Sequence, residues 1–170
     1  GIVACNYKIK KKLAVQLNKI FLEVVVSNGF EKDALKILKK KKNLRLIDAS
    51  NLSVSSISNF ISNFNSILFQ TPDIKKFTKK DFKIVSKKKP TLDQLNNLIF
   101  AFNVCRYVKS NSIVIANNKS TIGIGSGQPS RLDSCKIAIE KMNKFQPDSF
   151  VNSVAASDAF FPFLDGFEKL

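Results

Sequence analysis

Short apolar runs alternate with helical patterns over the first fifty residues. Residues 2–4, 22–27 and 44–47 are mostly apolar, and the middle run is rich in β-branched side chains, which predicts strands. Residues 13–21 carry the apolar spacing of a helix, and Asn28-Gly29 predicts a turn. Residues 31–40 predict an amphipathic helix, whose inward side chains are Ala34, Leu35, Ile37 and Leu38. Strand, helix and strand in this order predict a βαβ unit with a parallel sheet.

The pattern weakens in the middle of the chain and becomes helical again near residue 90. Residues 50–66 are poor in charge and rich in Ser and Asn, which favours a loop with weak strand content. Residues 67–70 and 82–86 are strand candidates. Thr91, followed three residues later by Gln94, predicts a capping box. The helix that follows carries one apolar stripe, which we interpret as core: Leu92, Leu95, Leu98, Ile99, Phe102 and Cys105.

The last third of the chain predicts a hairpin, a helix and a further strand. Residues 113–115 and 121–124 are apolar strands around an Asn117-Asn118 turn. A helix is predicted from residue 130 to about residue 144, and a strand of small residues over 153–157. The following string SDAFFPFLDG has three Phe residues around Pro162 and is predicted to be too short for a helix. Such an aromatic cluster is most often part of a core.

The composition limits the class of protein and its partners. A chain of 170 residues with 44% hydrophobic side chains can bury one core or parts of two small ones. The net charge of +15 comes almost entirely from lysine, and aromatic residues do not alternate with the lysine clusters at 39–42 and 87–89. We therefore keep a nucleic-acid-binding domain only as the least favoured alternative, and attraction of small anions remains compatible with the charge.

Neither a membrane segment nor a metal site is predicted. The sequence contains no run of about eighteen apolar residues, and its start lacks a signal-peptide pattern. Cys5, Cys105 and Cys135 are isolated, and histidine is absent, so the usual zinc ligands are missing. We expect buried, reduced thiols in a cytoplasmic protein that needs no metal.

One candidate binding motif can be recognised from spacing alone. Gly123, Gly125 and Gly127 recur at intervals of two, just before a proline and a serine that suit a helix start. A glycine loop that feeds a helix N-terminus can bind an anion through free N–H groups and the helix dipole, and Arg131 would lie at the same place. A tight structural turn is the alternative interpretation. A non-catalytic anion- or nucleotide-binding module that uses this loop is therefore a second functional hypothesis.

Several unusual strings follow one another in the order of a known family. They are GIVACN, FLEVVVSNGFEKDALKILKKKKNLRL, KKPTLDQLNNLIFAFNV, VKSNSIVIANNKSTIGIGSGQPSRLDS and SDAFFPFLDGFE. With these strings the chain resembles the transformylase part of the bifunctional purine biosynthesis family, AICAR formyltransferase/IMP cyclohydrolase, over nearly its whole length. The family's sequence continues on both sides, so the resemblance implies that the 170 residues are a fragment.

The resemblance also implies which residues bind substrate. Four positions match contacts to aminoimidazole carboxamide ribotide: Glu23, Asn111, Arg131 and Phe160. Two positions match contacts to the folate: Leu132 and Asp165. From the residues alone, Glu23 would be a surface or strand-edge glutamate and Asn111 a turn cap. Leu164 stands where family members commonly have an arginine, and Asn65-Ser66 stands where they usually have a glycine pair.

The implied reaction is formyl transfer from the co-substrate 10-formyltetrahydrofolate to the exocyclic amine of the ribotide, in IMP biosynthesis. The family uses a Lys-His pair for proton transfer and charge stabilisation, on a segment upstream of Gly1. We therefore expect no catalytic residue among these 170 and no turnover by the isolated fragment. The full-length family members also have IMP cyclohydrolase activity and work as homodimers, which implies a homodimer here.

The fold implied by the resemblance is α/β, with layered αβα, cytidine-deaminase-like halves in a duplicated transformylase domain. Residues 1–90 would form the end of the first half and a connector, and residues 91–170 most of the second half. The absence of His and of suitably spaced Cys ligands argues against a deaminase despite the name of the fold.

Overall fold

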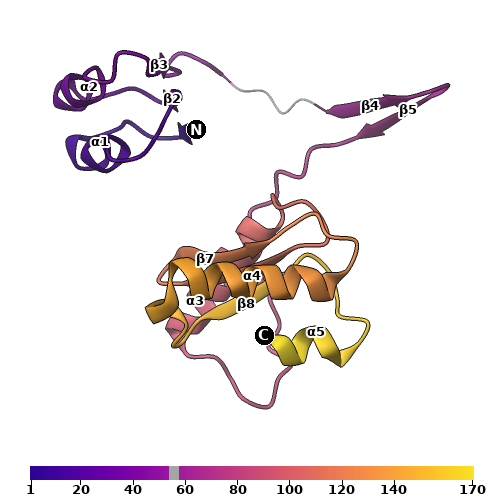
Figure 1. Cartoon of the computed structure of the whole chain (residues 1–170). Helices are drawn as coiled ribbons and strands as arrows, with labels where there is room; N and C mark the ends of the chain where they lie inside the picture. Colours follow the sequence, from indigo (N-terminus) through magenta and orange to yellow (C-terminus); the bar gives the residue numbers. More distant parts are fainter. Residues whose placement is uncertain (54–57) are drawn as a thin grey trace. The chain divides into compact units, whose positions relative to one another are not determined.

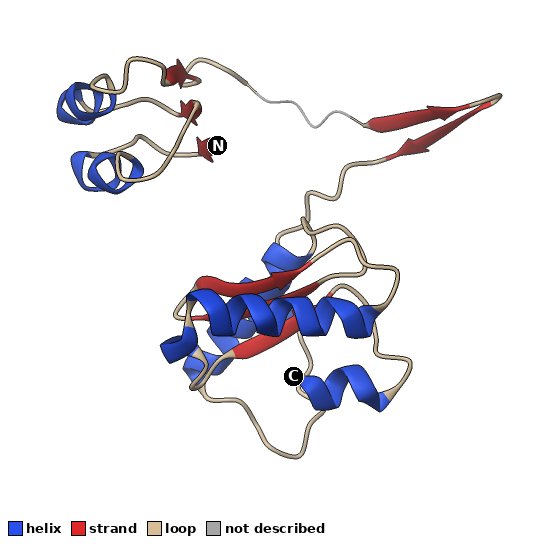
Figure 2. Cartoon of the chain, in the orientation of Figure 1, coloured by secondary structure: helices blue, strands red, loops and turns tan. Residues whose placement is uncertain are grey.

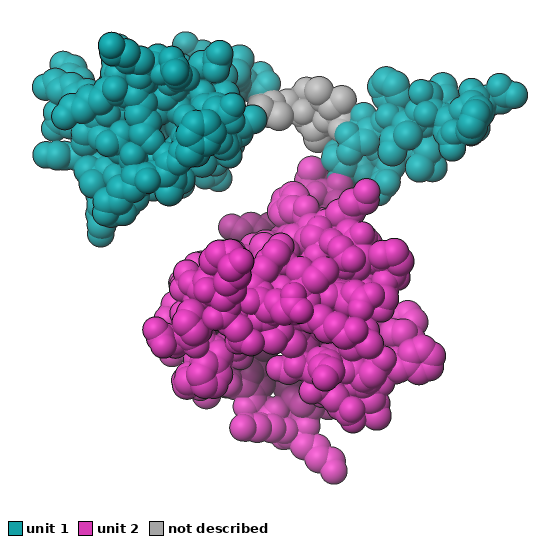
Figure 3. Space-filling model, viewed as in Figure 1, with its two compact units in different colours: residues 1–72 teal, residues 73–170 magenta. Residues whose placement is uncertain are grey.

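The computed structural model of the chain describes residues 1–53 and 58–170 (Figure 1). These residues form two compact units, residues 1–72 and residues 73–170 (Figure 3). Both units contain helices and strands, which confirms the mixed α/β class (Figure 2). Among the described residues, no helix has the length and apolar character needed to cross a bilayer. The predicted division at residue 90 into two transformylase halves stays a prediction.

The first unit begins with a parallel three-stranded sheet. Its strands β1 (Ile2–Cys5), β2 (Val24–Ser27) and β3 (Arg45–Asp48) lie in the order β1-β2-β3. Helix α1 (Lys11–Leu17) connects β1 to β2, and α2 (Lys32–Leu38) connects β2 to β3. Ala14, Val25 and Leu38 are fully buried in one cluster that joins both helices to the sheet. The predicted parallel βαβ arrangement is therefore confirmed.

The first helix is shorter than the apolar spacing predicted. It ends at Leu17, and the backbone N–H of Asn18 closes the last turn on the carbonyl of Ala14. Ile20 and Phe21 therefore lie outside the helix and are exposed, against our prediction. The chain turns back at this point so that Leu22, at 7% exposure, can enter the core just before β2.

A separate antiparallel hairpin completes the first unit. Strand β4 (Asn59–Asn63) pairs with β5 (Ser66–Gln70), and every residue of both strands is exposed. The strand predicted over 67–70 and the weak strand content of 50–66 are thereby confirmed. Residues 54–57 of that predicted loop lie outside the described residues.

The strand predicted over residues 82–86 is wrong. A short 3-10 helix η1 (Lys79–Asp81) precedes these residues, which pair with no strand in the described part of the chain. Instead Phe82 and Phe77 each pack edge-on against Phe102, with ring centroids 5.2 and 5.0 Å away. The apolar pattern thus reflects docking of side chains onto a helix, because a strand also needs hydrogen-bonded neighbours.

The second unit has three layers, with a helix on each face of a sheet. Its strands β6 (Ile113–Asn117), β7 (Ser120–Gly125) and β8 (Val154–Ser157) lie in the antiparallel order β7-β6-β8. Helix α3 (Leu92–Cys105) covers the face of Val114 and Ala116, and α4 (Arg131–Phe145) covers the face of Ile113 and Ile115 (Figure 2). The alternation of side chains along β6 therefore fills two cores. A 3-10 helix η2 (Pro147–Ser149) follows α4.

The predicted elements of this unit are largely confirmed. The Thr91 hydroxyl accepts a bond from the Gln94 N–H at 3.2 Å, and the Gln94 side chain accepts from the Thr91 N–H at 2.9 Å, which is the predicted capping box. The hairpin turn lies one residue later than predicted, at Asn118 and Lys119, whose φ values are +48° and +55°. Such values suit the tight turns that match the twist of two strands.

Two of the three spaced glycines lie in a strand and not in a loop. Gly123 and Gly125 belong to β7, and a Cβ on them would meet the carbonyl oxygens of Ala138 and Ser134 at 2.1 and 1.9 Å. Their absent side chains let α4 pack directly on the strand backbone. Only Gly127, at a φ of +67°, lies in the loop before α4. The predicted three-glycine loop is therefore wrong.

The C-terminal segment is partly helical, which corrects the prediction that it is too short for a helix. Helix α5 (Leu164–Lys169) begins directly after Phe163. Gly166 is buried, and a Cβ there would lie 3.0 Å from the Phe161 ring and 3.6 Å from the Cys135 sulfur. This close approach holds the short helix against α4. The cytidine-deaminase-like arrangement and its duplication stay predictions.

Candidate functional site

The predicted site residues of the second unit meet at one end of its sheet. Because β6 is antiparallel to both neighbours, its first residue Ile113 lies opposite Gly125 and Ser157, the last residues of β7 and β8. The segments that enter β6 and leave β7 and β8 therefore converge. They are residues 109–112, 126–130 and 158–163, with the first turn of α4 beside them.

An ion pair between Arg131 and Asp158 organises this end of the sheet. Arg131 Nη1 donates to Asp158 Oδ1 at 2.6 Å, and the two side chains are only 12% and 14% exposed. Arg131 Nε also donates to the Phe160 carbonyl at 3.1 Å. The Asp158 carboxylate accepts further bonds from the Ser112 N–H at 3.2 Å and from the Ser110 hydroxyl. Bonds between charged groups in such a poorly solvated place are strong, so the guanidinium is held in one orientation.

Asn111 fastens the entry of β6 to the loop before α4. Its Nδ2 donates to the carbonyls of Gln128 and Pro129 at 3.0 and 2.8 Å, and its backbone carbonyl accepts from the Ser134 hydroxyl at 2.7 Å. Both amide donors of the side chain are therefore used within the protein. For the Oδ1 atom, no hydrogen bond is found among the residues that the structure describes, so an acceptor is available to a ligand.

The aromatic residues after β8 lie beside the same ion pair. The Phe160 side chain is 81% exposed although its carbonyl is fixed by Arg131. The guanidinium carbon of Arg131 lies 6.0 Å from the centre of the Phe161 ring. Of the three residues that the resemblance assigned to one ligand, Arg131 thus bonds Phe160 directly, and Asn111 bonds the loop that leads into Arg131. Their roles in binding stay predictions.

For the other three predicted residues, the structure shows no hydrogen bond to Asn111, Arg131 or Phe160 among the described residues. Leu132 follows Arg131 in the first turn of α4 and is half-buried, and Asp165 is exposed in the first turn of α5, where its Oδ1 accepts from the Gly166 N–H at 2.7 Å. Glu23 belongs to the first unit, directly before β2. Its side chain is 59% exposed and lies 3.1 Å from the ammonium of Gly1.

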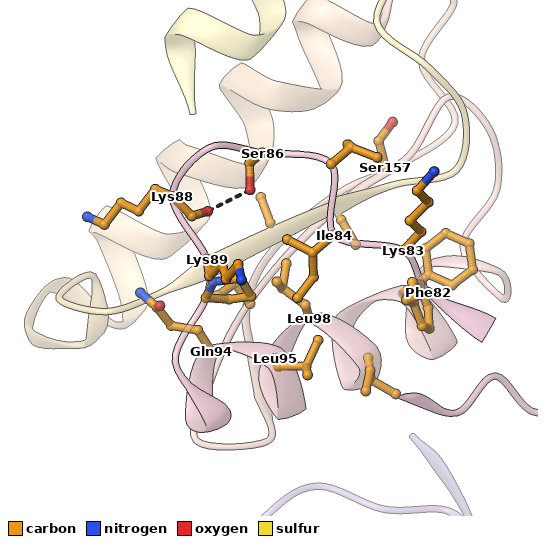
Figure 4. Close-up of a pocket in the computed structure, with 17 residues that line it drawn as sticks. Phe82, Lys83, Ile84, Ser86, Lys88, Lys89, Gln94, Leu95, Leu98 and Ser157 are labelled. Atoms are coloured by element: carbon orange, nitrogen blue, oxygen red, sulfur yellow. Dashed lines mark hydrogen bonds between the residues drawn. The ribbon is translucent and has the colours of Figure 1, made fainter. Parts of the chain in front are cut away.

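One cavity of the second unit lies away from these residues. It has a volume of about 620 Å³ and is formed by residues 82–90, helix α3 and strand β8 (Figure 4). Apolar side chains such as Ile84, Leu95 and Leu98 line it, with lysines from residues 82–90 around them. None of the six predicted site residues contributes to this lining. The cavity is therefore separate from the Arg131–Asp158 pair.

Two buried thiols, those of Cys105 and Cys135, lie near this end of the sheet. Burial raises the pKa of the Cys105 thiol, and burial also raises the pKa of Cys135 although Arg131 opposes the effect. Both thiols therefore stay protonated near neutral pH and are poor nucleophiles. Within the described residues, no group of three or more His, Cys, Asp and Glu side chains could hold a metal ion. That no metal is needed stays a prediction.

Sequence reasoning missed the residue that joins the site together. Asp158 bonds Arg131, Ser110 and Ser112, but it was not among the predicted site residues. It stands in the string SDAFFPFLDG, which had been noted for its aromatic residues. A buried guanidinium needs a carboxylate partner, and that requirement could have pointed to an aspartate near Phe160.

Comparisons with known proteins agree with the resemblance seen in the sequence. The model of the family described as AICARFT/IMPCHase bienzyme matches residues 1–141. The "Bifunctional purine biosynthesis protein PurH" of Limosilactobacillus reuteri (strain DSM 20016) is 41% identical over 167 residues, which cover 97% of this chain and 32% of that protein. The protein of the same name from Oceanobacillus iheyensis is 41% identical over 169 residues, covering 99% of this chain and 32% of that protein.

A third relative shows the same partial overlap. The PurH protein of Acetivibrio thermocellus is 40% identical over 176 residues, again covering 97% of this chain and 32% of that protein. The chain thus spans about a third of the length of the curated relatives it matches. Since the family model matches most of these 170 residues, the chain belongs to the AICARFT/IMPCHase bienzyme family.

Proposed function

We propose that this chain is the substrate-binding portion of a phosphoribosylaminoimidazolecarboxamide formyltransferase. The complete protein would transfer a formyl group from 10-formyltetrahydrofolate to aminoimidazole carboxamide ribotide, and would also act as an IMP cyclohydrolase. Membership of the AICARFT/IMPCHase family supports the reaction. The observation that carries the binding role is the convergence of Asn111, Arg131 and Phe160 at one end of the sheet.

The remaining hydrogen-bonding capacity of the site fits an anionic, polar ligand. A guanidinium has five N–H donors, and Arg131 uses one on Asp158 and one on Phe160 within the described residues. Its remaining donors would bind the phosphate or carboxamide oxygens of the ribotide. The Oδ1 atom of Asn111 would accept from a hydroxyl or amino group, and the exposed Phe160 ring would cover a face of the imidazole.

The proposed chemistry divides between this chain and the rest of the protein. The exocyclic amine of the ribotide is a weak nucleophile, so the reaction needs orientation of both substrates, a proton acceptor and stabilisation of charge on the formyl oxygen. The residues of this chain would orient the two substrates. Glu23 would also contact the ribotide, and Leu132 and Asp165 would contact the folate. A Lys-His pair from an upstream segment would supply the other two functions, since the chain contains no histidine.

The same resemblance supports the finer features of the proposal. The chain would span two successive cytidine-deaminase-like halves, with residues 1–90 forming the end of the first half and a connector, and residues 91–170 forming most of the second half. The complete protein would be a cytoplasmic homodimer that binds the ribotide and the formyl folate. The parallel β1-β2-β3 sheet and the three-layered second unit are compatible with such halves.

The test is ribotide binding by the 170-residue chain, measured by calorimetry. We expect Arg131→Ala to raise the dissociation constant at least about thirtyfold, because a charged hydrogen bond to the ligand is lost. Arg106→Ala is the matched control, since Arg106 also bonds an aspartate and a backbone carbonyl, both of Asp73, away from the proposed site. Equal weakening by both variants, or no binding by the unmodified chain, would overturn the proposal.

Turnover provides a second test, which asks whether the groups that transfer protons lie outside these 170 residues. The isolated chain should bind ribotide without forming formylated product, whereas a longer polypeptide that includes the upstream Lys-His segment should be active. Formylation by the 170 residues alone would contradict the proposal that the proton-transferring groups lie outside them.

A further inference from the structure

The cavity beside α3 has the size and lining of a small-molecule site. Residues 82–90, which we call the arch, border it together with helix α3 and the edge strand β8 (Figure 4). Its volume of about 620 Å³ lies within the range of about 300–1,000 Å³ that is usual for ligand pockets. All three segments contribute apolar side chains to the lining, among them Ile84, Leu98 and Val154.

The arch is fixed at both ends by contacts with α3. At its start, the Phe82 ring packs edge-on against Phe102, with the ring centroids 5.2 Å apart. Just after its end, the capping box of Thr91 and Gln94 sets the entry into α3. Residues 83–90 form no backbone–backbone hydrogen bond in the part of the chain that the structure describes. The cavity therefore has two firm walls, α3 and β8, and a border that can adjust to a ligand.

The charged side chains around the cavity all have the same sign. Lys83, Lys88 and Lys89 contribute to the lining, and the lining residues that the structure describes include no Asp or Glu. None of these three lysines forms an ion pair with a described residue. Their ammonium groups, on flexible stems, are therefore available to a ligand, and they favour a negatively charged one.

An apolar lining bordered by lysines selects one class of ligand. A nucleotide would leave water for walls that offer few hydrogen bonds, which costs free energy for every polar group left without a partner. An uncharged apolar molecule would gain from burial, but it would make no use of the lysines. A linear carboxylate with an alkyl chain uses both features, because the chain fills the cavity while the carboxylate meets an ammonium group.

We propose that this cavity binds a medium-chain fatty carboxylate, with its alkyl chain beside Ile84 and Leu98 and its carboxylate at the lysines of the arch. The site goes beyond the proposed substrate site, because none of the six predicted substrate-binding residues contributes to its lining. The exposed β4–β5 hairpin is the competing place for an alkyl chain, since all its strand residues are exposed. However, residues 59–70 contain no Lys or Arg that could bind the carboxylate.

Calorimetry with dodecanoate and octanoate on the 170-residue chain tests the proposal. We expect dodecanoate to bind with a dissociation constant below about 100 µM. Octanoate should bind at least about tenfold more weakly, because its shorter chain buries fewer methylene groups. The double variant Lys88→Glu with Lys89→Glu should weaken dodecanoate binding at least about tenfold, because the carboxylate then meets like charges. The matched control is Lys79→Glu with Lys80→Glu in η1, outside the lining, which changes the net charge equally. For this control we expect a change of about twofold or less.

Methyl resonances in NMR spectra locate the bound chain. Dodecanoate should shift the methyl resonances of Ile84 and Leu98, and it should leave those of Ile61 and Leu68 in the β4–β5 hairpin unchanged. Shifts in the hairpin alone would overturn the proposal. So would the absence of binding, equal affinity for the two carboxylates, or equal effects of the two double variants. Arg131→Ala should bind dodecanoate as the unmodified chain does, so a failure here is distinguishable from a failure of the proposed function.

Discussion

The chain contains two β-hairpins with similar local design and opposite surroundings. The β4–β5 and β6–β7 hairpins are both antiparallel, and both have turn residues other than glycine at positive φ. Every strand residue of the first hairpin is exposed, whereas Ile113, Val114, Ile115 and Ala116 of β6 are buried. The difference lies in what flanks them, because helices α3 and α4 cover the two faces of the second hairpin. An apolar pattern therefore specifies a hairpin, and neighbouring elements decide its burial.

The covered hairpin also gains a site at its end. Helix α4 starts where β7 ends, and β8 ends beside the start of β6, so Arg131, Asn111 and Asp158 meet across short distances. Burial by the helices excludes much of the water that would weaken these bonds. The side chains of the exposed hairpin are covered by no second layer among the residues that the structure describes. A rigid polar site thus depends on the helices that cover the sheet as much as on the strands.

The largest effect we predict removes the cover from β7. In Gly125→Val, the new side chain would begin 1.9 Å from the Ser134 carbonyl, so α4 could not stay on the strand. We expect the free energy of unfolding of the second unit to fall by more than about 4 kcal/mol, measured by urea denaturation. Ser120→Val on the same strand is the control, since this residue is exposed. A wild-type urea midpoint for Gly125→Val would contradict the close packing of α4.

The next effect concerns the ion pair at the end of the covered hairpin. Asp158→Ala leaves the Arg131 guanidinium and the Ser112 N–H without their carboxylate partner in a poorly solvated place. We expect a loss of about 3 kcal/mol of unfolding free energy. Asp133→Ala removes the exposed pair with Lys136 on the same helix and should cost less than about 1 kcal/mol. Equal costs for the two variants would show that burial of the Arg131–Asp158 pair does not matter.

The elements that the sequence predicted well are those whose signals are local. The capping box at Thr91 and Gln94 lies within one helix and was confirmed. The apolar stripe after it was confirmed in part, because Leu95 and Cys105 are buried whereas Leu92 is 66% exposed. The two apolar runs of the covered hairpin are also close in sequence, and the short turn between them sets the register in which they pair. The strand predicted over 82–86 was wrong because strands depend on distant partners, and Phe82 instead packs on Phe102 of α3.

The site required knowledge that spacing alone does not contain. Glycines at intervals of two suit a ligand loop and a helix packed on a strand equally well, and only the path of α4 shows that Gly123 and Gly125 serve packing. The glycine spacing had placed Arg131 at a helix N-terminus, but Asn111 and Phe160 were identified only by resemblance to a family, since each has a common structural role when considered by itself. Asp158 pairs with a residue 27 positions away, and no local pattern marks such a contact.

The exposed hairpin offers a smaller prediction of opposite sign. Phe64 has a φ of +46° in the turn, and its side chain is fully exposed, so it contributes backbone strain without packing. Phe64→Gly should stabilise the hairpin by about 1 kcal/mol, measured as slower amide exchange in β4 and β5. Phe64→Ala removes the ring but keeps a Cβ at the strained position, so it should give no comparable gain. If both variants slowed amide exchange equally, the gain in stability would come from loss of the aromatic ring and not from relief of backbone strain.

The smallest predicted effect lies in the connector between the two hairpins and depends on pH. Lys75 is 2.8 Å from the Asp81 carboxylate, and with the N–H and hydroxyl of Thr78 it lowers the pKa of Asp81 to about 2. Because the folded-state pKa lies below the usual value, the ionised carboxylate stabilises this turn at neutral pH, and that contribution is lost as the pH falls from about 4 towards 2. Titration of the Asp81 carboxyl by NMR should give a midpoint near 2, and Lys75→Ala should move it towards 3.8. Lys76→Ala is the matched control. An equal shift of the Asp81 pKa in that variant would show that the general field of the surrounding lysines, and not the Lys75 bond, lowers the pKa.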